Sequence, residues 1–244
     1  MSRIALITGG SGGLGSHMAK RMAEEGYQLA LHYYQNPEPA IKLLESLPAH
    51  NGQHHLLKAD LTQEDEIIAL VDQLKGKLGH LDVLINNAGI PFSGLSWKQT
   101  VKQWQDVFAI NTMAPWLLSK YCIPLLRETK KGRIVYLSSI VAHRPLTGTS
   151  IYAASKAALE GLTRAQAIEL SRFGITVNCI APGYFDAGMI SSVEEEIRKQ
   201  IILNTPEGRL GQADELAEAV LYLCSEKASF TTGQVLHING GLYI

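Results

Sequence analysis

Tyr152 and Lys156 are the two residues of this sequence best suited to acid–base chemistry, because they stand four positions apart in the run IYAASKAALEGL. Residues at this spacing project from one face of a helix. A phenol, with a pKa of about 10, becomes a stronger acid beside an ammonium, which favours the phenolate. Tyr152 could then donate a proton to a carbonyl oxygen while hydride reaches the carbonyl carbon, or accept one in the reverse reaction. The alternative is an exposed helix face on which a Tyr and a Lys coincide.

Ser138 and Ser139 follow the strand-like run RIVYL, which precedes the helix that carries Tyr152 and Lys156. A serine hydroxyl at that point can hydrogen-bond the same carbonyl oxygen as negative charge develops on it. Neighbouring residues of a strand point to opposite faces, so we expect at most one of the two serines to take part.

Asn111 stands four residues before Pro115 in a segment, Val101 to Leu126, whose pattern predicts one helix. Proline lacks an N–H, and its ring crowds the carbonyl four positions earlier, which belongs to Asn111. We therefore expect a kink here and a freed carbonyl that can hold a water molecule beside the site. The alternative is a break between two shorter helices.

A glycine-rich segment, Thr8 to Gly15, joins the first strand-like run to the first helical one and reads T-G-x-x-x-G-x-G. Glycine allows the positive φ of a tight turn and the close approach of a phosphate to the backbone. The helix N-terminus beyond it presents N–H groups and partial positive charge to a pyrophosphate. Its position in the first strand–helix turn predicts a dinucleotide site rather than a plain flexible turn.

Short apolar runs alternate with longer helix-patterned segments along the chain, which predicts parallel strands with helices on both faces. The predicted fold class is α/β, a doubly wound, Rossmann-type, seven-stranded parallel sheet that binds ligands at the carboxyl ends of its strands. The stretch from 184 to 209 has no clear pattern and is expected to be a substrate lid loop. The predicted strands are Arg3–Thr8, Leu29–Tyr33, His54–Ala59, Asp82–Asn86, Arg133–Ser138, Ile175–Ala181 and Gln234–Ile238. The predicted helices are Leu14–Glu25, Pro39–Leu47, Glu64–Leu78, Val101–Leu126, Ile151–Phe173 and Ala213–Ser225.

The composition predicts one globular domain over residues 1–244, because a 46% hydrophobic share supplies a deep core and no repeat or linker-like segment interrupts it. A formal net charge of −1 gives no field that would recruit nucleic acid or an acidic membrane. No apolar run approaches the roughly 18 residues that a membrane span needs. The three cysteines are scattered among apolar residues, and no histidines stand at metal-ligand spacing. We therefore expect reduced thiols, a cytoplasmic protein and no metal site.

The chain as a whole resembles the short-chain dehydrogenase/reductase family. The glycine-rich segment, the turn Asn86-Asn87-Ala88-Gly89, the Tyr–Lys pair and Ala181-Pro182-Gly183 stand in that family's order and spacing. The resemblance implies Tyr152 as the acid–base group, Lys156 as the residue that tunes it and holds the nicotinamide ribose, and Ser139, thirteen residues before the tyrosine, as the catalytic serine. It also implies Asn111 as the anchor of a water that links the lysine to solvent. The cofactor-binding residues that it implies are Gly9, Ser11, Gly12, Leu14, Gly15, Tyr33, Tyr34, Asp60, Leu61, Asn87, Gly89, Tyr152, Lys156, Gly183 and Phe185.

The end of the second predicted strand bears on the choice between NAD and NADP. Tyr33 stands where NAD-preferring relatives carry an acidic residue, so nothing there repels a 2′-phosphate. Gly12 stands where many NADP-preferring relatives carry Arg, so nothing obvious attracts that phosphate either. We expect NADP(H) to be favoured over NAD(H). Asp60 is placed to accept a hydrogen bond from the adenine amino group, although it could equally belong to the N-terminus of the next helix.

Within the family, GRLGQADELAEAVLYLCSE and TTGQVLHINGGLYI are most similar to the bacterial reductases of 3-oxoacyl-[acyl-carrier-protein]. That resemblance implies a homotetramer that reduces a 3-ketoacyl thioester carried by an acidic acyl carrier protein. Lys130, Lys131 and Arg172 fall close to the family's carrier-docking positions, or else are solvated charges at helix ends. A row of small residues on the Tyr–Lys helix either packs inside the fold or meets another subunit. This row is Ala154, Ala158, Gly161 and Ala165.

Three departures from the reductase pattern leave the substrate open. Ala187 stands where relatives place a Thr that bonds the nicotinamide carboxamide, Thr149-Ser150-Ile151 replaces Gln-Ala-Asn, and Gly12 replaces the Arg. One alternative is a reductase or dehydrogenase of another carbonyl or secondary alcohol, such as acetoacetyl-CoA, a sugar or a small ketone. Another is a non-catalytic dinucleotide-binding sensor, against which the intact Ser, Tyr and Lys argue.

Overall fold

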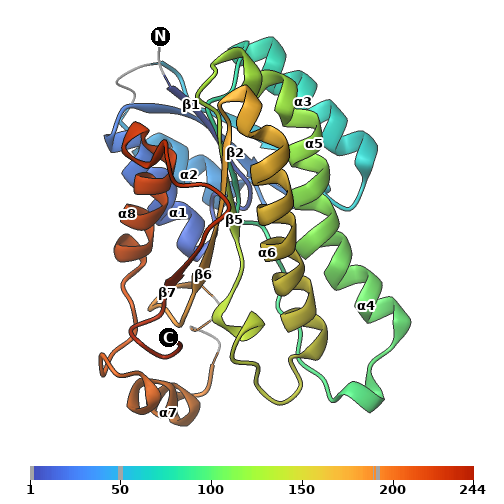
Figure 1. Cartoon of the computed structure of the whole chain (residues 1–244), viewed down its shortest axis with the longest axis vertical. Coiled ribbons are helices and arrows are strands. Elements are labelled where there is room, and N and C mark those ends of the chain that lie inside the picture. Colours follow the sequence, from blue (N-terminus) through green and yellow to red (C-terminus); the bar gives the residue numbers. More distant parts are fainter. Residues whose placement is uncertain (1–2, 49–51, 189, 191–192) are drawn as a thin grey trace.

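The computed structural model of the chain describes residues 3–48, 52–188, 190 and 193–244. Its strands form one parallel sheet in the order β3-β2-β1-β4-β5-β6-β7, which confirms the predicted doubly wound α/β class (Figure 1). The strand order reverses between β1 and β4, so the loops that follow these two strands leave toward opposite faces of the sheet. A crevice opens between these loops at the carboxyl ends of the strands. The strands are β1 (Arg3–Ile7), β2 (Tyr27–Tyr33), β3 (His55–Lys58), β4 (Val83–Asn86), β5 (Arg133–Leu137), β6 (Thr176–Pro182) and β7 (Val235–Ile238).

Helices cover both faces of the sheet, and each layer closes an apolar core. Ala5 and Ile7 of β1 face the layer of α1, α2 and α8, whereas Ile4 and Leu6 face the layer of α3, α5 and α6 (Figure 1). Alternate residues of a strand point to opposite faces, which is why nearly continuous apolar strands fit a sheet covered on both sides. The helices are α1 (Gly13–Glu24), α2 (Glu38–Ser46), α3 (Glu64–Leu78), α4 (Val101–Phe108), α5 (Ala114–Glu128), α6 (Ser150–Leu170), α7 (Glu195–Asn204) and α8 (Ala213–Cys224).

The segment predicted as one helix from Val101 to Leu126 stays helical throughout but changes its winding. A π-helical turn, Ala109–Met113, joins α4 to α5, and Pro115 lies in the first turn of α5. A wider turn at this point accommodates a residue that lacks an N–H. The irregularity expected at Asn111 is therefore present, and the alternative of a break between two helices is wrong.

The stretch 184–209, expected to be an irregular lid loop, contains the ten-residue helix α7. None of the α7 residues is buried, so this helix lacks the apolar stripe by which a helix is recognised in a sequence. Positions 189, 191 and 192 of the predicted loop lie outside the described residues. The expectation of a loop without regular structure is thus wrong for Glu195–Asn204.

Cys122, Cys179 and Cys224 are free and buried. Across the residues that the structure describes, no three His, Cys, Asp or Glu side chains gather in a way that could hold a metal ion. No helix in the same ranges is both long and apolar enough to cross a membrane.

Candidate active site

The first turn of α6 brings Tyr152 beside the carboxyl end of β5. The Tyr152 hydroxyl lies close enough to the Ser139 hydroxyl for the serine to lower the pKa of the phenol, and Ser139 Oγ accepts the N–H of Val141 at 3.2 Å. Lys156 Nζ lies 5.9 Å from the centroid of the Tyr152 ring. The structure therefore brings together the serine, the tyrosine and the lysine that the sequence singled out.

Burial shifts the pKa of both Tyr152 and Lys156. Lys156 is only 4% exposed, and its Nζ donates to the Leu137 carbonyl at 2.7 Å. Burial lowers the pKa of Lys156 from 10.5 to about 8. Burial also raises the pKa of Tyr152, and the Ser139 hydroxyl offsets only part of this rise. The direction is opposite to the one expected from the lysine, because desolvation of the phenolate outweighs any pull from the ammonium.

Asn111 clamps the turn after β4 to α6. Its Oδ1 accepts the N–H of Ile90 at 2.8 Å, and its Nδ2 donates to the Ile90 carbonyl at 3.0 Å and to Ser155 Oγ at 3.1 Å. A Cβ placed on Gly89 would lie 3.2 Å from Asn111 Oδ1 and 3.3 Å from Lys156 Nζ. The turn Asn86-Asn87-Ala88-Gly89 thus approaches the lysine closely, and a Cβ at position 89 would displace the ends of Asn111 and Lys156 by a few tenths of an ångström.

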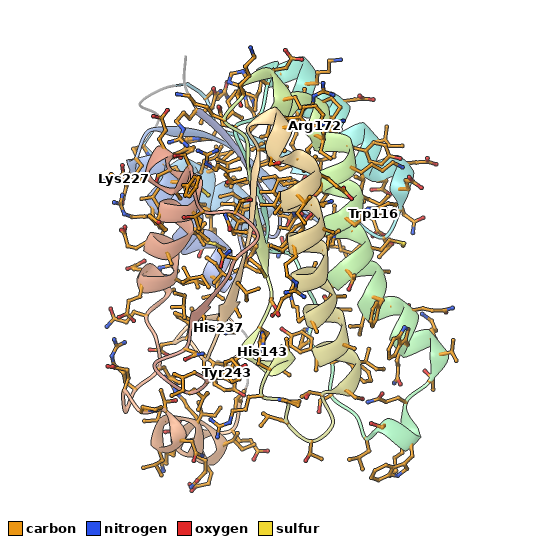
Figure 2. All side chains as sticks on the ribbon, in the orientation of Figure 1. Trp116, His143, Arg172, Lys227, His237 and Tyr243 are labelled. Atoms are coloured by element: carbon orange, nitrogen blue, oxygen red, sulfur yellow. The ribbon has the colours of Figure 1, made fainter. Side chains whose placement is uncertain are left out.

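Ser138 has a different environment from Ser139, as expected for neighbours on opposite faces of a strand. Its Oγ lies 2.8 Å from Glu160 Oε1 and 3.1 Å from the Lys156 carbonyl oxygen. Glu160 is buried and also pairs with His143 Nε2 at 2.8 Å. Figure 2 shows the His143 ring beside His237 and Tyr243, with ring centroids 4.6 and 4.9 Å away. The sequence patterns missed this cluster because its members come from four separate segments.

A cavity lies at the carboxyl ends of β1, β2, β3 and β4, and Gly89 in its wall lies beside Lys156. Residues that the sequence reasoning missed also line it: Gly13, His32, Asn36, Ala88, Ile90, Ile110 and Gly188. The predicted cofactor residues that line it are Gly9, Ser11, Gly12, Leu14, Gly15, Tyr33, Tyr34, Asp60, Leu61, Asn87 and Gly89.

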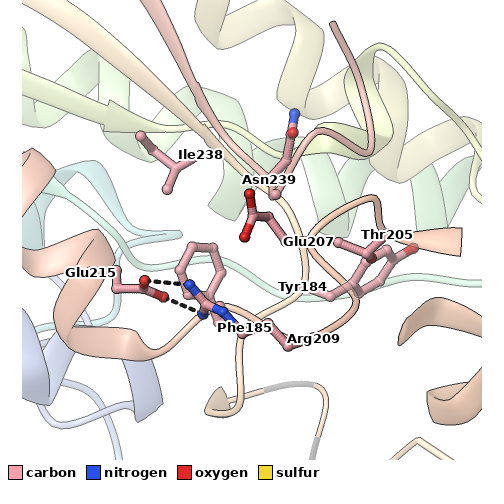
Figure 3. A pocket seen from close by; sticks show the side chains of 10 residues that line it. Tyr184, Phe185, Thr205, Glu207, Arg209, Glu215, Ile238 and Asn239 are labelled. Carbon is pink, nitrogen blue, oxygen red and sulfur yellow. Dashed lines mark hydrogen bonds and ion pairs between the residues drawn. The ribbon is translucent and has the colours of Figure 1, made fainter. Parts of the chain in front are cut away.

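Four other predicted cofactor residues do not line this cavity, namely Tyr152, Lys156, Gly183 and Phe185. A Cβ on Gly183 would lie 2.8 Å from Asn239 Cα, so the glycine serves the packing of β6 against the segment after β7. Phe185 is buried, and its ring lines a separate pocket beside the Arg209–Glu215 ion pair (Figure 3).

Asp60 lines the cavity and is not the N-cap of α3, which is Gln63. Its Oδ1 accepts the N–H of Thr62 at 2.9 Å and the Thr62 hydroxyl at 2.7 Å. Partial burial favours the neutral acid, but these hydrogen bonds and one from Tyr34 hold the pKa of Asp60 below its usual value. The carboxylate is therefore ionised and fixed at the edge of the cavity.

Comparisons with known proteins agree with this geometry. Residues 9–243 match the family model described as Enoyl-(Acyl carrier protein) reductase. A short-chain dehydrogenase/reductase of Serratia marcescens has a TM-score of 0.93 and 31% identity, over 98% of this chain and 97% of that chain. This chain belongs to the short-chain dehydrogenase/reductase family. It is also 35% identical over 244 residues to 3-oxoacyl-[acyl-carrier-protein] reductase of Staphylococcus aureus, covering 100% of this chain and 99% of that protein. Nodulation protein G of Azospirillum brasilense is 37% identical over 240 residues, with 98% of each chain covered.

Membership of this family makes the chain an NAD(P)-dependent oxidoreductase with a nicotinamide dinucleotide cofactor, and the cavity fits that group. Gly9 has a φ of +60°, and a Cβ on Gly15 would collide with the Gly9 carbonyl oxygen, so the turn needs glycine at both positions. Gly12 is the N-cap of α1 and provides no side-chain cap, and the first turn of α1 has no acidic residue. The free N–H groups and the helix dipole at this point suit a pyrophosphate.

The three candidate docking residues lie at the other end of the molecule from the site. Lys130 and Lys131 precede β5, whereas Ser139 follows it, and Arg172 comes after the C-terminal end of α6 (Figure 2). Twenty residues of a nearly continuous helix separate Arg172 from Tyr152, which is about 30 Å. Lys131 Nζ is also paired with Glu226 at 2.6 Å. These cations therefore do not flank the active site of their own chain.

Proposed function

We propose that this protein uses NADPH to reduce a 3-oxoacyl thioester, carried by an acyl carrier protein, to the 3-hydroxyacyl form. The observation that carries the proposal is the position of Gly89 between the dinucleotide cavity and Lys156. Gly89 lines the cavity, and a Cβ on it would lie 3.3 Å from Lys156 Nζ. A substrate carbonyl held between Gly89 and the Tyr152–Ser139 pair could accept hydride at its carbon and a proton at its oxygen. The name of the Staphylococcus aureus relative supports the substrate class.

In this mechanism Tyr152 is the proton donor. Because burial raises its pKa, the phenol carries its proton at neutral pH, which suits the reductive direction. Ser139 donates its hydroxyl hydrogen to the substrate oxygen as charge develops there, while its own Oγ is oriented by the N–H of Val141. The Lys156 ammonium favours the phenolate that remains after proton transfer. The cofactor supplies the hydride when bound.

An apolar cavity that shares Tyr184 with the surroundings of Tyr152 supports an acyl substrate. Tyr184 connects the two, because it lines this cavity and its phenol acts on the pKa of Tyr152. Ile140, the residue after Ser139, forms part of the same wall, and four residues of α7 also line the cavity. The lining residues are Ile140, Arg144, Leu146, Tyr184, Ile197, Gln200, Ile201, Asn204 and Leu242.

The proposed preference for NADPH rests on the end of β2. Tyr33, Tyr34 and Asn36 line the cavity there, and none of them is an acid that would repel a 2′-phosphate. Asp60, at the end of β3, is the nearby carboxylate, and two hydrogen bonds from Thr62 hold it in place. Comparable kcat/KM values for NADPH and NADH would contradict this preference.

We also propose that the protein is a homotetramer in which α4, α5 and α6 face another copy. The small-residue row on α6 is not packed inside the fold, since Gly161 and Ala165 are exposed and a Cβ on Gly161 would meet nothing. Beside this row an apolar hollow is lined by residues of α4, the π-helical turn, α5 and α6. Trp104 and Trp116 in that lining are 46% and 44% exposed. Large apolar surfaces of this kind mark interfaces more often than free surface.

For the carrier protein, the 30 Å between Arg172 and Tyr152 of one chain means that docking at the basic residues would serve the site of a neighbouring copy. Charge complementarity predicts that added salt weakens activity on carrier-linked substrates more than on small ketones. If salt affects both substrate types equally, the docking role of Lys130, Lys131 and Arg172 is refuted.

The decisive experiment measures initial rates of NADPH and NADH oxidation with an acetoacetyl thioester on carrier protein, with acetoacetyl-CoA and with a panel of ketones. We expect the highest kcat/KM for the carrier-linked thioester with NADPH. A simple ketone or sugar as the best substrate would instead favour the alternative, a short-chain reductase of another carbonyl.

Tyr152→Phe should lower kcat at least about 100-fold, because it removes the proton donor. Tyr136→Phe is the matched control. That phenol is buried under the sheet, where it bonds Ser119 and Gln166, so its loss should affect stability and not kcat. Undiminished turnover by Tyr152→Phe would reject the mechanism.

A further inference from the structure

His32, near the carboxyl end of β2, is a buried histidine in the wall of the dinucleotide cavity. It is 4% exposed, its Nδ1 accepts the N–H of Gly9 at 3.3 Å, and its Nε2 donates to the Ala59 carbonyl at 3.0 Å. A ring that accepts at one nitrogen and donates at the other is a neutral imidazole, here with its hydrogen on Nε2. The side chain therefore ties the glycine loop after β1 to the end of β3.

His32 bonds to Gly9, the residue on which the conformation of the glycine loop depends. Gly9 has a φ of +60°, and its carbonyl oxygen accepts the N–H of Gly12 and the Nδ2 of Asn87, each at 3.0 Å. The imidazole provides the acceptor for the N–H of the same residue. Gly9, Gly12 and Asn87 all line the cavity, so the conformation offered to a pyrophosphate depends on this set of bonds.

A second proton on the His32 ring would break one of these hydrogen bonds, the one from the N–H of Gly9 to Nδ1. The new Nδ1–H would point at the N–H of Gly9, so donor would face donor and the bond would be lost. Burial lowers the pKa of His32, while its hydrogen bond to Ala59 and the nearby Asp60 carboxylate favour the charged form. From the glycine loop it is the backbone N–H of Gly9 that faces the ring, and that group cannot stabilise an imidazolium.

We propose that His32 is a positioning residue for the dinucleotide, and that cofactor binding requires its neutral imidazole. This inference rests on the proposed cofactor site and adds a proton linkage to it. The Kd for the cofactor should rise as the pH falls through the titration of His32, by up to about tenfold per pH unit for one proton. A protonated ring that served as a phosphate ligand would give the opposite sign.

The test titrates the full-length protein with NADPH and with NADH between pH 5 and pH 8.5, in wild type, His32→Asn and His32→Gln. Asparagine keeps an oxygen acceptor near the position of Nδ1 and does not titrate, whereas glutamine keeps a donor near Nε2 and loses the acceptor. We expect His32→Asn to bind within about threefold of wild type at pH 8 and to lose the rise in Kd at low pH. We expect His32→Gln to bind more weakly at every pH. Comparing wild type with His32→Asn removes the titration of the 2′-phosphate itself from the readout.

His54 offers a matched control within the same strand pair. It is 5% exposed, its Nδ1 accepts the N–H of Leu29 at 3.0 Å, and its Nε2 donates to the Pro48 carbonyl at 3.1 Å. This is the same bridging pattern at a place that does not line the cavity. His54→Asn should therefore keep the pH dependence of the wild-type Kd, even if it lowers the melting temperature.

Three results would overturn the inference: a wild-type Kd independent of pH, a pH dependence that persists in His32→Asn, or binding that tightens as the pH falls. Titration of the His32 ring by NMR tests the same linkage without a variant, because the cofactor should lower the pKa of this ring and a rise would refute it. A wild-type protein that binds neither NADPH nor NADH at any pH would instead contradict the proposed function.

Discussion

Replacing Lys156 by methionine separates what this amine does for the reaction from what it does to the fold. The side chain is 4% exposed, and burial lowers its pKa from 10.5 to about 8. Between pH 8 and pH 10.5 the unfolded chain binds a proton that the folded chain has released. The free energy of unfolding of the wild type therefore rises with pH over this range. A shift of this size corresponds to about 3 kcal/mol. Below pH 8 both states are protonated, and the full cost of burying the charge is present.

The methionine variant fills a similar volume and has nothing to titrate at this position. The difference in unfolding free energy, wild type minus Lys156→Met, should therefore rise by about 3 kcal/mol from pH 8 to pH 10.5. Loss of the bond to the Leu137 carbonyl costs about 1–3 kcal/mol and shifts the whole difference without changing its slope. Urea denaturation followed by circular dichroism across this range measures the difference. The exposed Lys98, changed to Met, is the matched control for loss of a lysine at the surface.

The same variant should lose at least about 100-fold in kcat, since the ammonium that favours the Tyr152 phenolate is gone. A difference in unfolding free energy that stays flat from pH 8 to pH 10.5 would refute the reasoning. Such a result would mean that the folded protein solvates this amine as well as water does, whatever the effect on kcat.

Three further predictions test the elements around the site. Gly15→Ala should raise the cofactor Kd strongly, because its Cβ would collide with the Gly9 carbonyl oxygen. The control is Gly76→Ala, whose Cβ would meet nothing and which should stabilise α3 by up to about 1 kcal/mol. If calorimetry gives Gly15→Ala the same cofactor Kd as wild type, the proposed cofactor site is contradicted. Pro115→Ala should lower kcat and shift its pH profile by relaxing the π-helical turn around Asn111, and an unchanged profile would remove that role. Trp116→Glu should dissociate the tetramer when mass is measured by light scattering, and a monomeric wild type would reject the proposed interface.

Features that repeat along the chain could be predicted from the sequence, because each is encoded by neighbouring residues. The alternation of apolar runs and helical patterns gave the sheet and its two helical layers, and Pro115 alone pointed to the irregular helix at Asn111. The glycine spacing from Thr8 to Gly15 placed the loop that lines the dinucleotide cavity. Spacing along α6 placed Lys156 next to Tyr152.

Features that depend on contacts between distant segments could not be predicted in this way. Nothing local marks His32 as the partner of Gly9, twenty-three positions earlier, or Glu160 as the partner of His143. Helix α7 buries no residue and so leaves no apolar stripe to recognise. Residue type alone also could not give the direction of the Tyr152 pKa shift, which depends on how deeply the fold buries the phenol.

Burial moves the pKa values of Tyr152, Lys156 and His32 in the directions that favour their neutral forms, and this determines the shape of the pH profile. The pKa of Tyr152 is raised, that of Lys156 is lowered to about 8, and that of His32 is lowered. Near neutral pH the phenol is therefore protonated, the imidazole is neutral and the amine is still largely charged. At subsaturating cofactor, kcat/KM for reduction should fall above pH 8 as the ammonium is lost, and on the acidic side as His32 takes up a proton. His32→Asn should remove the acidic limb that His32 causes and leave the alkaline one. A profile that stays level through pH 8 would show that the charge on Lys156 does not support the reaction.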